Sequence, residues 1–366
     1  MAPVILALRS NGNFGVTVCT SGQHKEMLIQ AFADFSITPD IDCQVMSSGQ
    51  SLAALSAACF QKIDKVLVEG NYNFVLVQGD TTTVMVAAIC AFYNKIPVGH
   101  IEAGLRSGNF YSPFPEEINR KLVSTICELH FCPTKISMEN LIKENIHRDK
   151  IVYTGNTVVD ALHYIKKKRC DFPLNLPEHT KTLLTNYKKI ILVTAHRREN
   201  HGVAIEHLCT ALHTFIDQHP DVAIIYPVHL NPKVRMPVFR ALSGIPRISL
   251  IDPLPYADMV CLMEAAEFIL TDSGGIQEEA AAIRKPVLIF RDTTERPEGV
   301  AAGAAKLIGT NEESVRQHLE ELLAHPEYCR RMSEAGGNLY GDGHAADRIV
   351  KALTEYEQVS NPTTQG

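Results

Sequence analysis

The sequence lacks the features that mark membrane proteins, nucleic-acid-binding proteins and disulfide frameworks. No apolar run approaches the roughly 20 residues that a membrane helix needs, and no secretory leader is visible before the apolar residues 4–8. The net charge of −6 argues against broad binding to nucleic acid or to a membrane surface. Ten cysteines contain no C-x-x-C pair, so we expect reduced, buried thiols in a cytoplasmic protein, without a disulfide frame or a zinc site.

Several common catalytic motifs are also missing. The sequence has no G-x-G-x-x-G after its first strand pattern and no G-x-x-x-x-G-K-[ST], which argues against dinucleotide-dependent dehydrogenases and P-loop kinases. It has no G-x-S-x-G and no H-E-x-x-H. Asp80 and Asp272 have no clustered acidic neighbours in the sequence, so we expect neither a metal nor a cofactor.

What is present is a long alternation of strand and helix patterns. A chain of 366 residues that is 45% hydrophobic and 21% charged is expected to fold into two domains. Most strand candidates are continuous apolar runs, as in parallel strands that are buried on both faces. They fall at residues 16–19, 74–77, 97–101, 129–132, 151–153, 190–193, 223–226, 248–251, 268–270 and 287–290.

This alternation predicts an α/β fold with two Rossmann-like domains, parallel sheets and a cleft between them. The basic run 166–169 and the prolines that follow it indicate a solvated linker. We therefore expect an N-terminal domain at 1–165, a second domain at 166–345, and a tail at 346–366 whose helix packs back on the first domain.

The block T-D-S-G-G-I-Q-E-E at 271–279 is the most informative motif. It predicts a buried strand, a glycine turn and a helix that opens at Ile276, with Glu278 and Glu279 in its first turn. Free N–H groups at such a helix end attract phosphate, so Ser273, Gly274 and Gly275 are expected to hold a diphosphate, and Glu279 to accept ribose hydroxyl groups. The alternative is an ordinary turn with Ser273 as the helix cap. A second polar block, R-D-T-T-E-R-P-E at 291–298, follows the next strand and favours a ligand site.

Three carboxylates follow strand ends or open a helix in the first half. Asp80, Glu102 and Glu116 are expected at one edge of the sheet, where neighbouring carboxylates suit acid–base catalysis. The alternative is three unrelated caps or surface acids, with Asp80 and the threonines after it capping a helix.

In the second half, His196, Arg197 and Arg198 follow a strand, and guanidinium groups suit phosphate binding. An isolated histidine is more often structural, and adjacent arginines often only make a loop soluble. His229 also follows a strand, either as a ligand contact or as an inward-facing structural residue.

Taken together, these blocks resemble the non-hydrolysing UDP-N-acetylglucosamine 2-epimerases, in the order and spacing of that family. The resemblance runs from about residue 2 to about residue 345, and it implies two Rossmann-like domains of the GT-B type in a homodimer. It implies reversible conversion of UDP-GlcNAc to UDP-ManNAc through UDP and 2-acetamidoglucal, without NAD or metal. The matching residues are 78–83, 100–106, 112–120, 154–160, 196–200, 226–231, 272–279 and 291–298.

The resemblance also implies roles for single residues. Asp80, Glu102 and Glu116 become the candidate acid–base groups, with the base left open among them. His196 would assist departure of the diphosphate. UDP would be bound by seven residues of the second half: Arg197, Arg198, His229, Ser273, Gly274, Gly275 and Glu279.

Two departures from the family pattern affect function. Family members carry a strand and a Gly-Thr-Arg-Pro-Glu loop before the segment that matches Met1-Ala2-Pro3, and this sequence contains neither. Without them we expect exposed sheet edges and reduced activity. Relatives also bind a second, activating UDP-GlcNAc; Gln23 and His24 of that site are present, but Ala58 stands where its arginine would align. We therefore expect weak or altered activation.

Three rival functions remain at this stage: a GT-B glycosyltransferase, a hydrolysing epimerase that releases free ManNAc, and a UDP-sugar-binding protein that is inactive through loss of the N-terminal loop. The three carboxylates argue against a plain transferase, which needs no elimination machinery.

Overall fold

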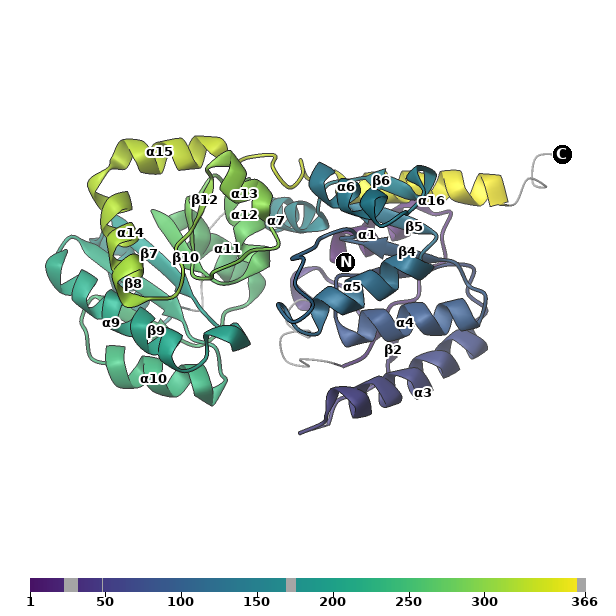
Figure 1. Cartoon of the computed structure of the whole chain (residues 1–366), viewed down its shortest axis with the longest axis horizontal. Helices are drawn as coiled ribbons and strands as arrows, with labels where there is room; N and C mark the ends of the chain where they lie inside the picture. The colour runs from purple at the N-terminus through teal and green to yellow at the C-terminus, as the bar shows by residue number, and fades with distance from the viewer. Residues whose placement is uncertain (23–31, 48, 169–175, 361–366) are drawn as a thin grey trace. The chain divides into compact units, whose positions relative to one another are not determined.

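The chain divides into two compact units, each built on parallel strands (Figure 1). The computed structural model describes residues 1–22, 32–47, 49–168 and 176–360. Unit 1 comprises Met1–Tyr164 and Gly341–Gly366, and unit 2 comprises Ile165–Tyr340. Among the described residues, no helix has both the length and the apolar character needed to cross a membrane.

Unit 2 contains a sheet of six parallel strands. Their order is β12-β11-β10-β7-β8-β9, so the first strand of this unit, β7, lies beside β10. The strands read as unbroken apolar runs because helices cover both faces of the sheet. They are β7 (Lys189–Thr194), β8 (Val222–Pro227), β9 (Ile248–Ile251), β10 (Phe268–Thr271), β11 (Val287–Ile289) and β12 (Ala305–Leu307).

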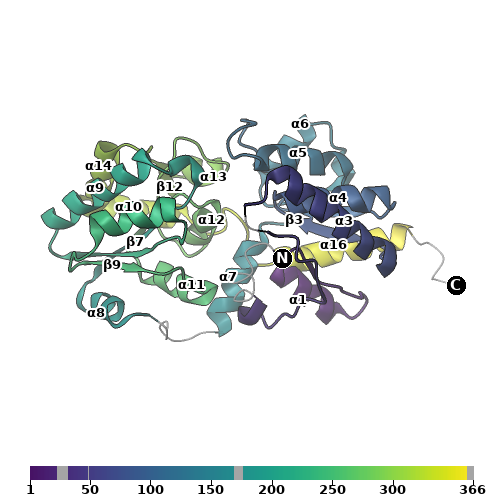
Figure 2. The ribbon, with the colours of Figure 1, turned by 90° about the horizontal axis from the view of Figure 1, so that it is seen from below.

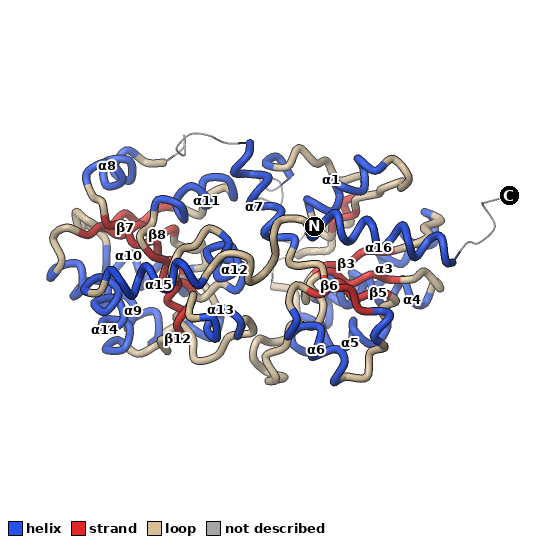
Figure 3. Tube along the Cα trace, turned by 90° about the horizontal axis from the view of Figure 1, so that it is seen from above, coloured by secondary structure: helices blue, strands red, loops and turns tan. Residues whose placement is uncertain are grey.

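Helices lie on both faces of this sheet, with α9, α10 and α14 on one side and α8 and α11 on the other (Figure 3). Leu208, Leu212, Phe215 and Leu319 enter the largest apolar cluster of the unit. The helical segments are α8 (Glu178–Asn186), η2 (Arg198–Asn200), α9 (Val203–Gln218), α10 (Pro232–Leu242), α11 (Tyr256–Ala265), α12 (Gly274–Ala282), α13 (Pro297–Ala302), α14 (Glu312–Ala324) and α15 (Pro326–Ala335).

Unit 1 contains two groups of parallel strands. Four strands run in the order β3-β4-β5-β6, and β1 pairs with β2 in a separate two-stranded sheet. The strands are β1 (Cys19–Thr20), β2 (Ile41–Asp42), β3 (Val75–Gln78), β4 (Val98–Ile101), β5 (Leu129–Cys132) and β6 (Ile151–Tyr153).

Helices α3, α4 and α5 share one apolar cluster of unit 1, and α3 lies along α4 (Figure 2). Helices α1 and α16 pack on each other and against β4 and β5. The helical segments of this unit are α1 (Ala2–Asn11), α3 (Leu52–Gly70), α4 (Thr82–Tyr93), α5 (Glu116–Ile126), α6 (Lys135–Lys143), η1 (Arg148–Lys150) and α16 (Ala345–Ser360), while α7 (Thr157–Lys168) leads into unit 2.

The returning helix α16 is held to unit 1 at its N-terminus. The Asp160 carboxylate accepts hydrogen bonds from the backbone N–H groups of Ala345 at 3.2 Å and Ala346 at 2.8 Å. Arg348 forms an ion pair with Asp342 at 2.6 Å and donates to the Thr154 carbonyl at 2.9 Å. Asp160 thus anchors the C-terminal helix by accepting two of its free N–H groups, and the Thr154 carbonyl adds an acceptor for the Arg348 guanidinium.

The expected α/β fold with parallel sheets is confirmed, while three local predictions are wrong. Of the predicted strand 16–19, only Cys19 is in β1, and the sequence pattern missed the short strands β2 and β12. Helix α12 begins at Gly274 rather than Ile276, because both glycines adopt helical geometry directly after Ser273. Glu278 and Glu279 therefore lie beyond the first helical turn.

Two histidines are buried side by side in unit 1 and make its stability depend on pH. His100 and His130 are register partners on β4 and β5, and both are fully buried. Loss of hydration lowers the pKa of His100 to about 3 and that of His130 to about 4, from 6.5. Both therefore stay neutral in the folded chain at pH 5, whereas the unfolded chain protonates them.

We expect the free energy of unfolding to fall as the pH drops from 6.5 toward 4, by up to about 1.4 kcal/mol per pH unit for each histidine. His130→Leu should reduce the slope of the unfolding free energy against pH by the contribution of one histidine. This reduction is expected even if the substitution changes the stability at pH 7. Urea unfolding curves between pH 7 and pH 4.5 measure the two slopes. Parallel slopes for both proteins would contradict this assignment.

Candidate active site

In unit 2, the polar loops after β7 and β10 meet where the strand order reverses. The first three strands of the unit extend from β7 in one direction and the last three from β10 in the other. In doubly wound sheets, ligands bind at the carboxyl ends of strands beside such a reversal. His196 follows β7 and Ser273 follows β10, so both predicted motifs lie at this point.

Asp272 joins these two loops. Its buried carboxylate accepts backbone N–H groups from His196 at 2.9 Å and Arg197 at 2.8 Å, and the Asn200 amide at 2.9 Å. The His196 Nδ1 lies 3.4 Å from an Asp272 oxygen. Dehydration lowers the pKa of the His196 imidazole more than Asp272 raises it, so the ring is neutral near pH 7. The hydrogen bond to Asp272 fixes the main chain of His196, while the His196 side chain is 41% exposed and remains accessible to a ligand.

The N-terminus of α12, for which the sequence predicted an anion site, lies directly after β10. Ser273 is the N-cap residue of this helix, as the alternative interpretation placed it, but its side chain makes no cap hydrogen bond. A Cβ at Gly275 would have no heavy atom within 4 Å, which leaves room for a ligand beside the backbone. A Cβ at Gly274 would instead lie 2.6 Å from the Arg296 guanidinium, so this glycine makes space for an arginine.

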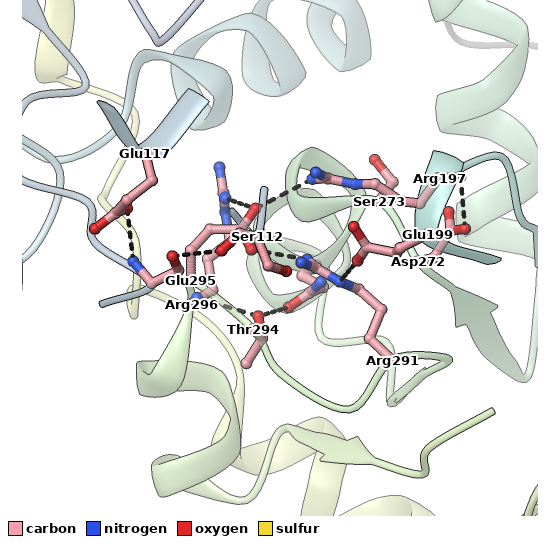
Figure 4. A network of polar contacts seen from close by, with 12 residues as sticks. Ser112, Glu117, Arg197, Glu199, Asp272, Ser273, Arg291, Thr294, Glu295 and Arg296 are labelled. Carbon is pink, nitrogen blue, oxygen red and sulfur yellow. Dashed lines mark hydrogen bonds and ion pairs between the residues drawn. The ribbon is translucent and has the colours of Figure 1, made fainter. Parts of the chain in front are cut away.

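The block 291–298 forms a buried charge network (Figure 4). Glu295 contacts three guanidinium groups: Arg291 at 2.7 Å, Arg296 at 2.6 Å and Arg197 at 3.1 Å. These cations hold the pKa of Glu295 far below its usual value despite the opposing effect of burial. The network continues through Arg291 to Glu199 at 2.8 Å and through Arg296 to Glu278 at 2.7 Å.

The two predicted phosphate-binding arginines differ in whether they belong to this network. Arg197 is engaged by Glu295, whereas Arg198 is exposed and forms no ion pair with any described residue. His229 is half-buried, and its ring stacks on that of His196 with centroids 5.6 Å apart. The Asn231 N–H donates to His229 Nδ1 at 3.1 Å, which leaves Nε2 to carry the proton of the neutral ring.

Glu279 is buried on α12, beyond the first turn of the helix. Burial raises the pKa of its carboxyl to about 7; Glu278 adds to this shift, and Tyr256 opposes it. At neutral pH this carboxyl is therefore divided between its acidic and ionised forms.

In unit 1, Asp80 and Glu102 meet at a single arginine on α5. Asp80 follows β3 and lies 2.6 Å from Arg120 Nη2, while Glu102 follows the neighbouring β4 and lies 3.5 Å from the same nitrogen. The cap of α4 is Thr81, whose hydroxyl accepts the Val84 N–H at 3.4 Å. The alternative that this segment caps the helix is thus confirmed for Thr81, while the Asp80 carboxylate pairs with Arg120.

Glu116 is the first residue of α5, one turn before Arg120 on the same helical face. The next residue, Glu117, has a different part: its buried carboxylate accepts the N–H groups of Ser107 at 2.9 Å and Gly108 at 3.2 Å. It thereby fixes the loop before the helix.

Several residues that organise the site escaped the sequence interpretation. Four of them lie within the sequence blocks described above, but the sequence pattern predicted no function for them: Arg120, Asn200, Asp272 and Glu295. The spacing of Glu116 and Arg120, four residues apart on a helix, was the one available signal for the first of them. Gln23 and His24 lie outside the described residues. Within the described ranges, no group of three or more His, Cys, Asp or Glu side chains is arranged to hold a metal ion.

Comparison with known proteins identifies a family. Residues 6–354 match the family model described as UDP-N-acetylglucosamine 2-epimerase. A probable UDP-N-acetylglucosamine 2-epimerase of Ralstonia nicotianae is 47% identical over 97% of this chain and 95% of its own length. The UDP-N-acetylglucosamine 2-epimerase of Escherichia coli K12 is 46% identical over 96% of this chain and 94% of its own.

Solved structures agree. The chain is similar to UDP-GlcNAc 2-epimerase from Neisseria meningitidis bound to UDP-GlcNAc, with a TM-score of 0.90 and 43% identity over 97% of this chain and 96% of that one. It is also similar to the Methanocaldococcus jannaschii enzyme in complex with UDP-GlcNAc and UDP, with a TM-score of 0.82 and 32% identity over 97% and 95% of the two chains. The chain therefore belongs to the UDP-N-acetylglucosamine 2-epimerase family.

Proposed function

We propose that this protein interconverts UDP-GlcNAc and UDP-ManNAc by inverting carbon 2 of the sugar. The observation that carries the proposal is the pair Asp80 and Glu102, brought from two strand ends to one guanidinium. Membership of the epimerase family favours this function over a GT-B glycosyltransferase, a hydrolysing epimerase and an inactive UDP-sugar-binding protein.

The reaction proceeds by elimination and re-addition. A carboxylate of the set Asp80, Glu102 and Glu116 takes the proton from carbon 2, the electron pair forms the C1–C2 double bond, and the C1–O bond to UDP breaks. The products at this stage are UDP and 2-acetamidoglucal. UDP then adds back to carbon 1 while a carboxylic acid returns a proton to the opposite face of carbon 2.

The groups of unit 2 suit the diphosphate. The N–H groups at the start of α12, with Gly275 open beside them, provide a partial positive charge for phosphate oxygens. Arg198 adds an uncommitted positive charge, and His196 and His229 can donate from their rings. Stabilising the additional negative charge that develops on the departing UDP lowers the barrier to elimination. Arg197, Ser273, Gly274 and Glu279 complete the proposed UDP site.

Deuterium exchange tests the chemistry directly. Proton NMR of UDP-GlcNAc in deuterium oxide should show deuterium entering carbon 2 together with signals of UDP-ManNAc. Asp80→Asn and Glu102→Gln should each lower kcat by about 10²–10⁴, whereas Glu69→Gln, an exposed carboxylate of the same unit, should not. Free ManNAc with UDP would identify a hydrolysing enzyme, and bound UDP without exchange would identify a binding protein.

UDP affinity should depend on the ionisation of Glu279. An ionised carboxylate accepts two ribose hydroxyl groups, and its protonated form loses part of that capacity. Since the pKa is raised to about 7, we expect the Kd of UDP to increase as the pH falls below 7, by at most about tenfold per unit. Titration calorimetry from pH 8 to pH 6 should show this in the wild type and a flatter profile in Glu279→Gln. Identical profiles would remove Glu279 from the UDP site.

We further propose that activation by UDP-GlcNAc is weak here. Ala58 contributes only a methyl group from α3, and the ammonium of Lys62, one turn later, donates to the carbonyls of Cys43 at 2.6 Å and Gln44 at 2.9 Å. The Lys62 ammonium is thereby held at these carbonyls, and Lys65 on the same helix lies 3.9 Å from Glu69, so neither replaces an arginine at position 58. Trace UDP-GlcNAc should stimulate turnover of UDP-ManNAc only slightly, and Ala58→Arg should increase the stimulation. Strong stimulation of the wild type would contradict this expectation.

The family resemblance also supports a cytoplasmic homodimer. Sedimentation equilibrium should give twice the mass of one chain, and a monomeric mass at all concentrations would argue against the dimer.

A further inference from the structure

Arg120 is the one described cation that contacts both Asp80 and Glu102. Its side chain is 5% exposed, and its Nη2 lies 2.6 Å from Asp80 Oδ2 and 3.5 Å from Glu102 Oε1. The same guanidinium donates through Nη1 to the backbone carbonyl of Glu102 at 2.8 Å. It therefore binds the side chain of one residue, and both the side chain and the main chain of the other.

Hydrogen bonds from α5 and from β4 also hold the main chain next to the Asp80 carboxylate. Asn119, beside Arg120, donates its amide to the Asp80 carbonyl at 2.8 Å. The preceding Gly79, whose φ is 84°, accepts a hydrogen bond from His100 at 2.8 Å, and the low pKa of that histidine keeps its ring neutral. Asp80 is thus fixed at its main chain as well as at its carboxylate.

Glu102 needs such support because its backbone is strained. Its φ is +66°, a left-handed conformation that residues with a Cβ rarely adopt because it is energetically unfavourable. The hydrogen bond from Arg120 to the Glu102 carbonyl holds this conformation, and with it the direction of the side chain.

We propose that Arg120 is a positioning residue, whose guanidinium sets the separation and direction of the two carboxylates that exchange protons with carbon 2. The proposal rests on the epimerase function proposed above. Two neighbouring carboxylates repel each other, and one planar guanidinium can bind both while also reaching a carbonyl. A lysine at this position offers one compact charge and cannot keep all three contacts in the same geometry.

Substitution by lysine separates positioning from charge. Arg120→Lys should keep the fold and the affinity for UDP, which binds through unit 2, but lower kcat by about a hundredfold with little change in KM. The C2 deuterium exchange should fall in parallel. Arg106→Lys is the matched control, because Arg106 is similarly buried in unit 1 and pairs with Glu144 at 2.7 Å without contacting Asp80 or Glu102. That variant should stay within a few-fold of the wild type.

Chemical rescue provides a readout that a purely structural role would not give. Arg120→Ala should be less active than Arg120→Lys and should recover part of its kcat in millimolar guanidinium chloride. Urea has a similar planar shape without charge, so it should give no recovery. The comparison is made well below denaturing concentrations, with circular dichroism to establish that each variant is folded.

The positioning role is wrong if Arg120→Lys retains full kcat or changes only KM. It is also wrong if the loss of kcat in Arg120→Lys is no greater than the loss in Arg106→Lys. A folded Arg120→Ala that guanidinium does not rescue would also overturn it. A wild-type chain without C2 exchange would overturn the epimerase function itself, and the role of Arg120 with it.

Discussion

Within each unit, the position of the candidate site residues depends on one constraint: strands that run parallel end at the same edge of their sheet. In unit 2, β7 and β10 are neighbours in register, so His196 and Ser273 emerge side by side although more than seventy residues separate them. In unit 1, β3 and β4 are neighbours in the same way, and Asp80 and Glu102 follow them. Polar side chains from distant parts of the sequence are thereby collected without any long-range motif.

Burying several charges at a sheet edge costs free energy unless each charge has a counter-ion. The two units meet this requirement with groups of opposite sign. Unit 1 places one cation, Arg120, between two carboxylates, whereas unit 2 places one anion, Glu295, among three arginines. Asp272 is a third variant, a buried anion that accepts mainly N–H groups. Since breaking a buried pair leaves its partner uncompensated, these shared ions constrain the loops more tightly than isolated surface pairs would.

The sequence pattern was sufficient for the architecture and for locating the polar blocks, because buried parallel strands leave an unbroken apolar signature and glycine-rich turns follow them. It failed for β2 and β12, which are two and three residues long and partly exposed. It also placed the start of α12 two residues late, since glycine carries no propensity signal for the first turn of a helix. Arg120 and Asp272 were overlooked because their partners are distant in sequence, and a charged residue alone does not indicate whether it faces solvent or a buried counter-ion.

On the proposed mechanism, the shared cation has a consequence for reversibility. Inversion at carbon 2 requires one group to remove the proton from one face and another to deliver a proton to the opposite face. In the reverse direction these roles exchange, so each group must serve both as base and as acid. Two carboxylates that follow neighbouring strands and contact the same guanidinium, at 2.6 Å and 3.5 Å, can each take and return a proton. Protonation of either one leaves the arginine bound to the other, so the separation across the sugar is kept in both directions. As for any catalyst, the equilibrium ratio of the two epimers is set by the relative stability of the two nucleotide sugars, so the shared guanidinium affects only how fast that ratio is reached.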